Sequence, residues 1–403
     1  MSAEFDPLRA ITALRALDAD SGGRRIAWTA DWERARAWLR GELAGIPGVQ
    51  ERTDEAGNLW ARLPGRSPDT VVLGSHLDCV PNGGWLDGAL GVVAALEALR
   101  TIAADPEPPD RSVALVDWAD EEGARFGHSL LGSSAAAGLL DVAAVSALRD
   151  RDGIALPDVL AAHGVAVARM PDARASLDGV IAYLELHIEQ GPVLERTGRP
   201  CAAVDGCLGV RRTLVTFTGE AGHAGATPMD GRRDPVQAAV AYVPLMTAAA
   251  TGALGFATVG SLRAEPGTAT AIPERCVLTL DLRHRDLGAL EGLAAEAAGL
   301  AEAAAGRFGC EAAVEPLWGI DPVRFDDALV SAALEVTDGG QPLTSGPLHD
   351  AAAVARAGVP AAMIFVRSRG GVSHSRAEDS DEADLAVGLR AFWRLARVAT
   401  GAA

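Results

Sequence analysis

Two short apolar runs that end in acids constrain the fold of this chain most. TVVLGSHLD (residues 70–78) and SVALVDWAD (residues 112–120) are separated by a helical segment, residues 88–102. Such runs are typical of strands buried on both faces of a parallel sheet, and functional side chains gather at the carboxyl ends of these strands. The pattern predicts an α/β domain whose chemistry lies at one edge of its sheet.

The middle of the chain follows a different pattern. We expect strands at 213–218, 257–263, 275–283 and 310–316, and helices at 234–250 and 287–305. The order strand, helix, strand, strand, helix, strand is that of a ferredoxin-like sandwich. The α/β pattern then returns after Asp321. We therefore expect one catalytic domain made of residues 1–208 and 323–403, interrupted by an inserted domain, residues 209–322.

Composition narrows the class of ligand. The formal net charge is −18, from 36 basic and 54 acidic residues. A chain with this charge repels nucleic acid and anionic membrane surfaces, so a small molecule is the expected ligand. All the basic residues are arginine. This excludes a Schiff-base lysine, a phosphate-loop lysine and a carbamylated lysine that bridges two metals.

The cysteines and the apolar segments favour a cytoplasmic protein without a membrane span. Five cysteines are scattered without C-x-x-C spacing, so neither a disulfide framework nor a thiolate zinc site is expected. Residues 1–10 carry acids where a signal peptide needs a basic segment, so no export is expected. Residues 235–262 lack charge, but Pro244, Gly252 and Gly255 interrupt them, which disfavours a membrane helix.

Two adjacent acids, Glu121 and Glu122, follow the second apolar run in VDWADEEGARFG. Adjacent acids usually belong to a solvated face. Here, however, His76 and Asp78 end the first apolar run, and Asp87 follows in the turn of WLDGALG. One carboxylate of such a pair can bind a metal while its neighbour, aimed differently, takes a proton from water. The arrangement predicts hydrolytic chemistry.

Five side chains in strand-end or turn contexts form a candidate set of metal ligands. They are His76, Asp87, Glu122, His187 in ELHIEQG and His374 in GVSH. Residues i and i+2 of a strand point to the same side, so we expect Asp78 to orient His76 from behind. Asp87 is placed to bridge two divalent ions, about 3.5–4 Å apart, that polarise a carbonyl and activate water. Imidazole with carboxylate suits zinc, and manganese, cobalt or nickel fit the same set.

These motifs resemble the di-metal amidohydrolase family of allantoate amidohydrolases and N-carbamoyl-L-amino-acid hydrolases, relatives of the aminoacylase and carboxypeptidase-type zinc exopeptidases. The matching runs are GSHLDCVPNGGWLDGALG, EEGARFGHSLLGS, ELHIEQGPVLE, GHAGATPMDGRRD, SGPLHDAAAVA and MIFVRSRGGVSH, in the family's order. The resemblance implies an α/β, zinc-exopeptidase-like catalytic domain with a central mixed sheet. It also implies a ferredoxin-like lid domain through which two chains dimerise.

The resemblance assigns the ligands to two divalent metal ions per chain. It implies that His76 and His187 hold one ion. It implies that Glu122 and His374 hold the other, with Asp87 between the two. On the same basis, hydrolysis proceeds by attack of a metal-bridged water.

Five further residues receive roles from the resemblance. Glu121 resembles the general base that takes the proton of the attacking water and later protonates the leaving nitrogen. His223, in the inserted domain, resembles a histidine that reaches across a dimer to stabilise the oxyanion. Arg283 resembles the arginine that grips the substrate carboxylate, for which a planar guanidinium is suited. Gln190 and His349 are expected to line the substrate pocket.

Several positions depart from the family pattern. Leu208 stands where the family has Gln, and Thr270 where a motif has its second Asn. Pro347 and Leu348 alter the loop before His349, and Arg376 alters the segment after His374. An amide offers both a donor and an acceptor, so its loss weakens recognition of a ureido or carboxylate group. We expect allantoate to be a poor substrate and a compound with an apolar part to be a better one.

The default function is hydrolysis of an amide or ureido C–N bond in an anionic small molecule, with an N-carbamoyl-L-amino acid as substrate. One alternative is an aminoacylase, a dipeptidase or a pathway-specific amidase on the same scaffold. His187 favours the carbamoylase branch, because exopeptidase relatives commonly carry an acid there. A second alternative is a binding protein without turnover, which the intact Glu121 disfavours. The other histidines, His128, His163 and His284, are interpreted as structural.

Overall fold

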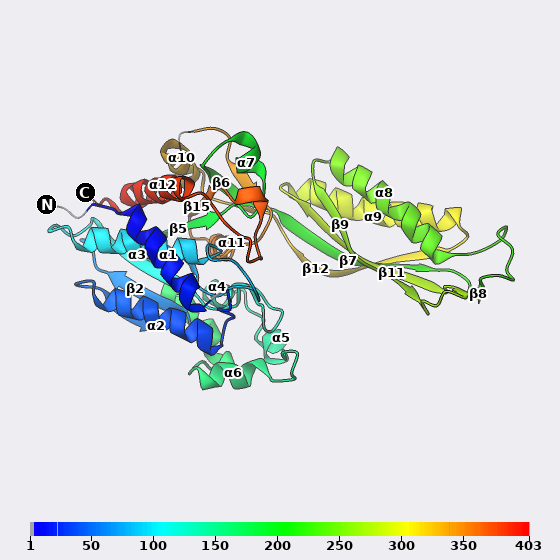
Figure 1. Cartoon of the computed structure of the whole chain (residues 1–403), viewed down its shortest axis with the longest axis horizontal. Coiled ribbons are helices and arrows are strands. Elements are labelled where there is room, and N and C mark those ends of the chain that lie inside the picture. Colours follow the sequence, from blue (N-terminus) through cyan, green and yellow to red (C-terminus); the bar gives the residue numbers. More distant parts are fainter. Residues whose placement is uncertain (1–3, 22, 338, 403) are drawn as a thin grey trace. The chain divides into compact units, whose positions relative to one another are not determined.

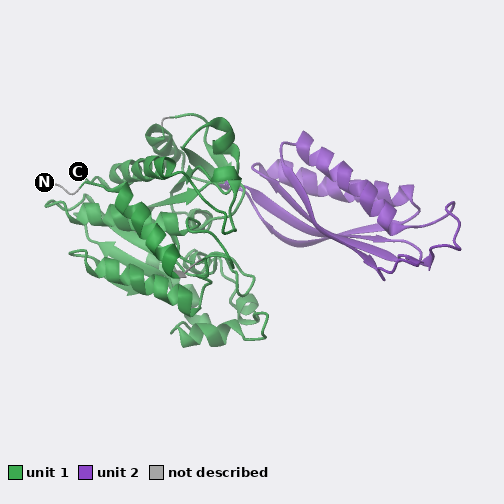
Figure 2. Ribbon diagram, in the orientation of Figure 1, with its two compact units in different colours: residues 1–206, 324–403 green, residues 207–323 purple. Residues whose placement is uncertain are grey.

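A computed structural model describes residues 4–21, 23–337 and 339–402. The chain divides into two compact units (Figure 2). The first comprises the residues up to Gly206 and those from Arg324 onward, and the second comprises Cys207–Val323. The first three residues of the acidic N-terminal segment, from which we expected no export, lie outside the described residues. Among the residues described, no helix combines the length and the apolar character needed to cross a membrane.

The first unit is an α/β domain built on one large sheet (Figure 1). Its strands are β1 (Gln50–Thr53), β2 (Leu59–Leu63), β3 (Ser67–His76), β4 (Arg111–Trp118), β5 (Val180–Ile188), β6 (Cys201–Cys207), β13 (Val323–Arg324), β14 (Leu343–Ser345) and β15 (Ala361–Val366). Its α-helices are α1 (Pro7–Ser21), α2 (Ala30–Ala44), α3 (Ala89–Ala103), α4 (Leu131–Ala136), α5 (Val142–Ser146), α6 (Leu156–Ala162), α7 (Val193–Thr197), α10 (Asp327–Val336), α11 (Asp350–Arg356) and α12 (Glu382–Thr400). Two 3₁₀ segments are η1 (Val167–Leu177) and η2 (Arg369–Gly371).

The large sheet is mixed, as predicted. The strand order is β1-β2-β4-β3-β5-β15-β6-β13, with β14 paired to β6. The central pairs β4–β3, β3–β5 and β5–β15 are parallel, whereas β1–β2, β2–β4 and β15–β6 are antiparallel. The helices α1, α3 and α12 share one hydrophobic core with this sheet. Because β3, β4, β5 and β15 run the same way, the loops that follow them open at one edge.

The second unit has the ferredoxin-like order that the sequence predicts. Its elements are β7 (Gly209–Thr218), β8 (Gly222–His223), α8 (Pro235–Gly252), β9 (Phe256–Glu265), β10 (Ala271–Ile272), β11 (Arg275–His284), α9 (Leu287–Arg307) and β12 (Glu311–Ile320). The main sheet runs β12-β7-β11-β9 with antiparallel pairs throughout. The short strands β8 and β10 pair with each other. Figure 1 shows α8 and α9 side by side against this sheet, with which they form a separate core.

Candidate metal centre

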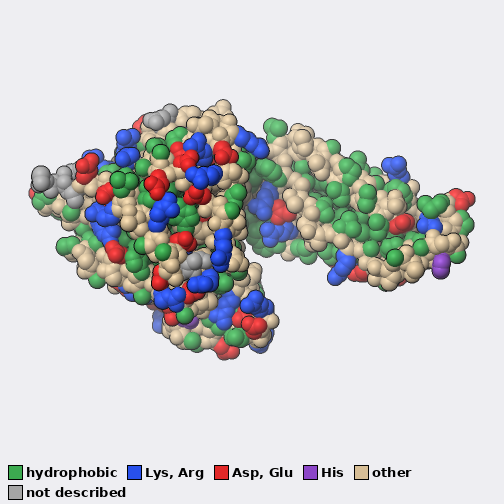
Figure 3. All heavy atoms as spheres, in the orientation of Figure 1, with side chains coloured by type: hydrophobic (Ala, Val, Ile, Leu, Met, Phe, Trp, Pro, Cys, Tyr) green, Lys and Arg blue, Asp and Glu red, His purple; other side chains and the backbone are tan. Residues whose placement is uncertain are grey.

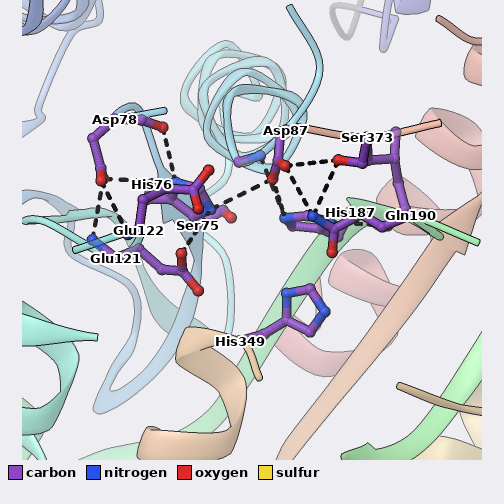
Figure 4. Close-up of polar contacts among 12 residues, drawn as sticks. Ser75, His76, Asp78, Asp87, Glu121, Glu122, His187, Gln190, His349 and Ser373 are labelled. Atoms are coloured by element: carbon purple, nitrogen blue, oxygen red, sulfur yellow. Dashed lines mark hydrogen bonds and ion pairs between the residues drawn. The ribbon is translucent and has the colours of Figure 1, made fainter. Parts of the chain in front are cut away.

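The five predicted ligands come together at the carboxyl edge of the large sheet as two clusters. Figure 4 labels four of them, which are His76, Asp87, Glu122 and His187. His76, Asp87 and His187 form the first cluster, and Asp87, Glu122 and His374 form the second. Within each cluster, the candidate ligand atoms lie within 4.8 Å of one another. Asp87 belongs to both clusters. One of its carboxylate oxygens faces each cluster, which is the arrangement required of a bridging ligand.

In the first cluster, both imidazoles present their Nε2 atoms to Asp87. His187 Nε2 lies 3.2 Å and His76 Nε2 lies 3.9 Å from Asp87 Oδ1. His187 Nδ1 lies 2.9 Å from the carbonyl oxygen of Ile188, and His76 Nδ1 lies 3.1 Å from that of Asp78. A carbonyl oxygen only accepts, so each Nδ1 carries a proton, and in the neutral ring Nε2 is the nitrogen that keeps a lone pair. These buried nitrogens are therefore oriented as ligand atoms.

In the second cluster, His374 completes the site from the C-terminal segment. Its Nε2 lies 3.3 Å from Asp87 Oδ2 and 3.4 Å from Glu122 Oε2. Glu122 Oε1 is buried and has no hydrogen-bond partner. A buried carboxylate oxygen without a donor is costly unless a cation occupies the space beside it. The donor set of this cluster therefore fits a divalent cation.

Asp78 lies beside His76, but in a loop and not on the strand face from which we expected it to orient the ring. Strand β3 ends at His76, so Asp78 lies in the following loop and not on the same strand face. Its carboxylate accepts the backbone N–H groups of Glu121 and Glu122, at 3.2 Å and 3.1 Å. Asp78 Oδ1 also lies 3.6 Å from His76 Nδ1. One carboxylate therefore holds the His76 ring together with the backbone that presents both glutamates.

Glu121 lies beside the first cluster without belonging to it. Its Oε2 is 3.7 Å from His76 Nε2, and its side chain is largely buried. The preceding residue, Asp120, has a φ of 59°, a left-handed conformation that turns the chain sharply before the two glutamates. Asp120 Oδ2 accepts a hydrogen bond of 2.8 Å from the indole N–H of Trp28. This turn directs Glu121 and Glu122 differently, as their predicted separate roles require.

Gln190 and His349, the predicted pocket residues, both adjoin the clusters. Gln190 has a φ of 57°, and its Nε2 donates to Asp87 Oδ2 at 2.8 Å. The His349 ring lies 4.4 Å from the His187 ring, centroid to centroid. Two supporting residues were not predicted. Ser373 donates to Asp87 Oδ2 at 3.0 Å, and Glu378 accepts the backbone N–H of Asp87 at 3.0 Å. Their nearness to His374 in the sequence was the only signal.

The remaining predicted residues belong to the second unit and form two groups. His223 on β8 lies beside Thr270, whose carbonyl oxygen accepts the N–H of Ala224 at 3.0 Å. Arg283 pairs with the start of β7, next to the buried Leu208. The ten paired residues of β7 and β11 separate these groups. At about 3.4 Å per residue, they lie roughly 30 Å apart.

Two of the three histidines interpreted as structural, His163 and His284, form polar contacts with residues outside the two clusters. His163 Nδ1 lies 2.8 Å from Glu33 Oε1, and His284 Nε2 donates to the carbonyl oxygen of Ala253 at 2.9 Å. Burial lowers the pKa of His128. Pro347 and Leu348 are half-buried in the loop before α11. The carbonyl oxygen of Pro347 accepts the Ser345 hydroxyl at 2.8 Å.

The ionisable groups of the centre are buried close to one another, and this shifts their pKa values. Burial and the neighbouring Asp87 raise the pKa of Glu122 to about 7. Burial raises the pKa of Glu121 well above its ordinary value. Burial alone would raise the pKa of Asp87, but hydrogen bonds with His187 and His374 hold it well below the usual range. The same bond with Asp87 raises the pKa of His374 to about 9. In the metal-free protein, protons bound to Glu122 and His374 thus offset part of the negative charge that metal ions would otherwise neutralise.

We therefore expect the metal-free protein to lose stability as the pH rises from 6.5 to 9. The folded pKa values of Glu122 and His374, about 7 and about 9, exceed their unfolded values, so folding binds protons that the unfolded chain releases. Stability from such groups is lost as the pH passes through the folded pKa. The melting temperature of chelated protein should fall across this range, and that of protein saturated with zinc should fall less. Equal pH dependence of the two forms would contradict the account.

Comparison with known proteins places the chain in a family. The model of peptidase family M20/M25/M40 matches residues 72–398. An N-carbamoyl-L-amino acid amidohydrolase from Geobacillus stearothermophilus is 40% identical over 390 residues, which cover 94% of each chain. An allantoate amidohydrolase from Bacillus subtilis is 35% identical over 382 residues, covering 93% of this chain and 92% of that one.

Solved structures agree with this placement. The crystal structure of an amidase of the hydantoinase/carbamoylase family from Burkholderia multivorans is 29% identical, has a TM-score of 0.89 and covers 99% of both chains. The similarity therefore extends over both units and is not limited to the metal-binding motifs. The protein belongs to the peptidase M20/M25/M40 family, on the branch that includes allantoate and N-carbamoyl-L-amino-acid amidohydrolases.

Proposed function

We propose that this protein is a metal-dependent amidohydrolase that cleaves a linear amide or ureido C–N bond of a small N-substituted amino acid, with an N-carbamoyl-L-amino acid as the first choice of substrate. One observation carries the proposal: two ligand clusters share Asp87, and the buried carboxylate of Glu121 lies beside them. The relatives named as allantoate and N-carbamoyl-L-amino acid amidohydrolases support the substrate class.

Two divalent ions fit the residues present. His76 and His187 would hold one ion, Glu122 and His374 the other, and Asp87 both. Mixed imidazole and carboxylate ligands suit zinc, while manganese, cobalt and nickel are compatible. When bound, such a pair of ions polarises the scissile carbonyl and makes water a stronger acid. The protein supplies the orientation of the ligands and the proton transfers.

Glu121 would carry those proton transfers. Its carboxylate is close to the first cluster but outside the ligand set, so it is available to take a proton from the attacking water. Burial raises the pKa of this carboxyl, which favours its holding that proton until the nitrogen leaves. Protonation of the nitrogen turns a poor leaving group into a neutral amine or ammonia. Asp78 keeps Glu121 in place through its backbone N–H.

His223 has the tautomer that an oxyanion requires. Its Nδ1 accepts the backbone N–H groups of Gly225 and Ala226, at 3.0 Å and 3.1 Å. An acceptor Nδ1 leaves the proton on Nε2, and the side chain is exposed, so Nε2–H is available as a donor. Arg283 suits the substrate carboxylate, with its Nε donating to Asp281 Oδ1 at 2.8 Å. We assign these two residues to opposite ends of the bound substrate.

This assignment calls for two chains. A small substrate cannot contact His223 and Arg283 of one inserted domain, because roughly 30 Å of β-sheet separates them. A homodimer paired through the inserted domains solves the problem, since one chain supplies Arg283 and the other supplies His223. Exposed apolar side chains on α8 and β9 favour such pairing (Figure 3): Val240, Leu245, Phe256 and Leu262. A pocket that uses both Leu208 and Thr270 needs two chains for the same reason.

Mixing two inactive variants should therefore restore activity. A His223→Ala chain keeps its own Glu121, and a Glu121→Gln chain keeps its own His223. In a mixed dimer, one of the two sites has both residues intact. We expect up to a quarter of the wild-type activity after equal mixing with subunit exchange, because half the dimers are mixed and each has one complete site. No recovery despite verified exchange, or full activity in a monomer, would contradict a shared site.

A substrate panel tests the proposed function. N-carbamoyl, N-formyl and N-acyl amino acids and allantoate should be compared at equal concentration with zinc-loaded protein. We expect turnover of an N-carbamoyl compound with an apolar side chain to exceed that of allantoate, because the buried Leu208 replaces an amide. Leu208 also favours the alternative of an aminoacylase, which preferential N-acyl turnover would support. Binding without turnover of any compound would identify a binding protein.

A further inference from the structure

Glu378 is a buried carboxylate that joins two distant segments of the metal centre. Its Oε1 accepts the backbone N–H groups of Leu86 and Asp87, each at 3.0 Å. Its Oε2 lies 2.9 Å from the hydroxyl oxygen of Ser373, which in turn lies 3.0 Å from Asp87 Oδ2. Glu378 thus touches the backbone of the shared ligand directly and reaches its carboxylate through one hydroxyl group.

The same contacts secure the loop that carries His374. This side chain is 51% exposed, the most exposed of the five candidate ligands, and its φ of 53° is left-handed. A non-glycine residue in that conformation persists only when its surroundings hold it there. Ser373 precedes His374 and Glu378 follows it, and the backbone N–H of Glu378 donates to the carbonyl oxygen of Ser375 at 3.0 Å. The loop is therefore fastened on both sides of the ligand.

Two neighbouring residues, Gly84 and Arg376, also depend on or support the position of the Glu378 segment. A Cβ atom on Gly84 would lie 2.1 Å from Glu378 Oε1 and 2.4 Å from its Cβ, so only glycine fits there. Arg376, one of the departures from the family pattern, donates from Nη2 to Asn82 Oδ1 at 3.1 Å. The segment 373–378 is thus attached to the segment 82–87 by an exposed bond as well as by the buried ones.

We propose that Glu378 is a positioning residue of the metal centre, which holds Asp87 and His374 in one arrangement so that the second cluster can receive a cation. The inference rests on the proposed function, because it takes the two clusters to be metal sites. Residues that support metal ligands from behind commonly change metal affinity by about 10–100-fold when they are removed. Glu378 supports two ligands at once, Asp87 and His374, and both of them belong to the second cluster.

A zinc competition titration tests this role without using activity. A chromogenic chelator competes with the protein for Zn²⁺, and the two binding equivalents are resolved for each variant. Glu378→Ala should weaken at least one of the two zinc equivalents by about 10–100-fold. Glu378→Gln should bind zinc much as the unsubstituted protein does. Its amide oxygen can accept both backbone N–H groups, and its amide nitrogen can donate to Ser373.

Glu382→Ala is the matched control. It removes the same charge at the start of α12, shortly after Glu378 in the chain, but Glu382 is exposed and pairs with Arg15. If Glu378→Ala does not fold, Ser373→Ala and Gly84→Ala replace it, because the first breaks the link to Asp87 and the second displaces the Glu378 carboxylate. Each should weaken zinc binding.

The outcomes separate the two proposals. If the unsubstituted protein binds no zinc, the proposed function fails. If it binds two equivalents and Glu378→Ala, or both replacement variants, bind them equally tightly, the positioning role is wrong. A lower melting temperature of metal-free Glu378→Ala with unchanged zinc affinity also overturns the inference, because Glu378 would then serve folding alone.

Discussion

Glu121→Gln should retain both metal ions and lose about 10²–10⁴ in turnover, the usual range for a positioned general base. Glutamine has nearly the shape of glutamate, so the backbone N–H of residue 121 can still donate to Asp78. Its amide cannot accept a proton from water at neutral pH. The loss should appear in kcat more than in KM, because the substrate contacts assigned to Arg283 and His223 are unchanged.

Glu122→Gln is the matched comparison for this variant. The two residues are adjacent and carry the same charge, but Glu122 Oε2 faces His374 in the second cluster. We expect Glu122→Gln to lose one metal equivalent, whereas Glu121→Gln keeps both. Metal analysis after gel filtration distinguishes the two variants. If Glu121→Gln loses metal and Glu122→Gln keeps it, the roles of base and ligand are exchanged.

Asp87→Ala should abolish activity, because Asp87 is the ligand that both clusters share. Its removal leaves each cluster with two candidate ligands and removes the charge that orients the three histidines. We expect each zinc equivalent to weaken by more than about 100-fold, beyond the loss caused by removing a supporting residue. Zinc titration of the folded variant measures this loss.

Asp87→Asn provides the control for packing. Asparagine fills the same volume and keeps the backbone N–H that Glu378 accepts, but it is a poor metal ligand. It should therefore resemble Asp87→Ala in metal binding while matching the circular dichroism of the unsubstituted protein. Tight binding of two zinc ions by Asp87→Asn would show that Asp87 does not bridge.

Local patterns predicted most of the fold. The strands that end near His76 and Trp118 and the helices of the second unit follow from apolar periodicity, and their order predicted the ferredoxin-like sheet. The pairing of β15 between β5 and β6 could not be predicted in the same way. Strands far apart in the chain pair according to their packing, and the apolar run AAMIFV does not specify its neighbours.

The candidate ligands were predictable because they end strands or occupy turns, and such positions converge at one sheet edge. The supporting contacts were not predictable. Trp28 reaches Asp120 across 92 positions, and Glu378 reaches Leu86 across 292. These bonds depend on how loops pack, which residue spacing does not encode. The separation of Thr270 from Arg283 depends likewise on the antiparallel register of β7 and β11.

The most direct test of the account is ammonia release from an N-carbamoyl-L-amino acid. Ureido cleavage yields ammonia and the free amino acid in equal amounts, whereas simple peptide cleavage yields no ammonia. Protein loaded with two zinc equivalents should release both products, stop after chelation and resume when zinc is restored. Undiminished release by protein shown to be free of metal, or no release by fully metal-loaded protein across the carbamoyl series, would contradict the account.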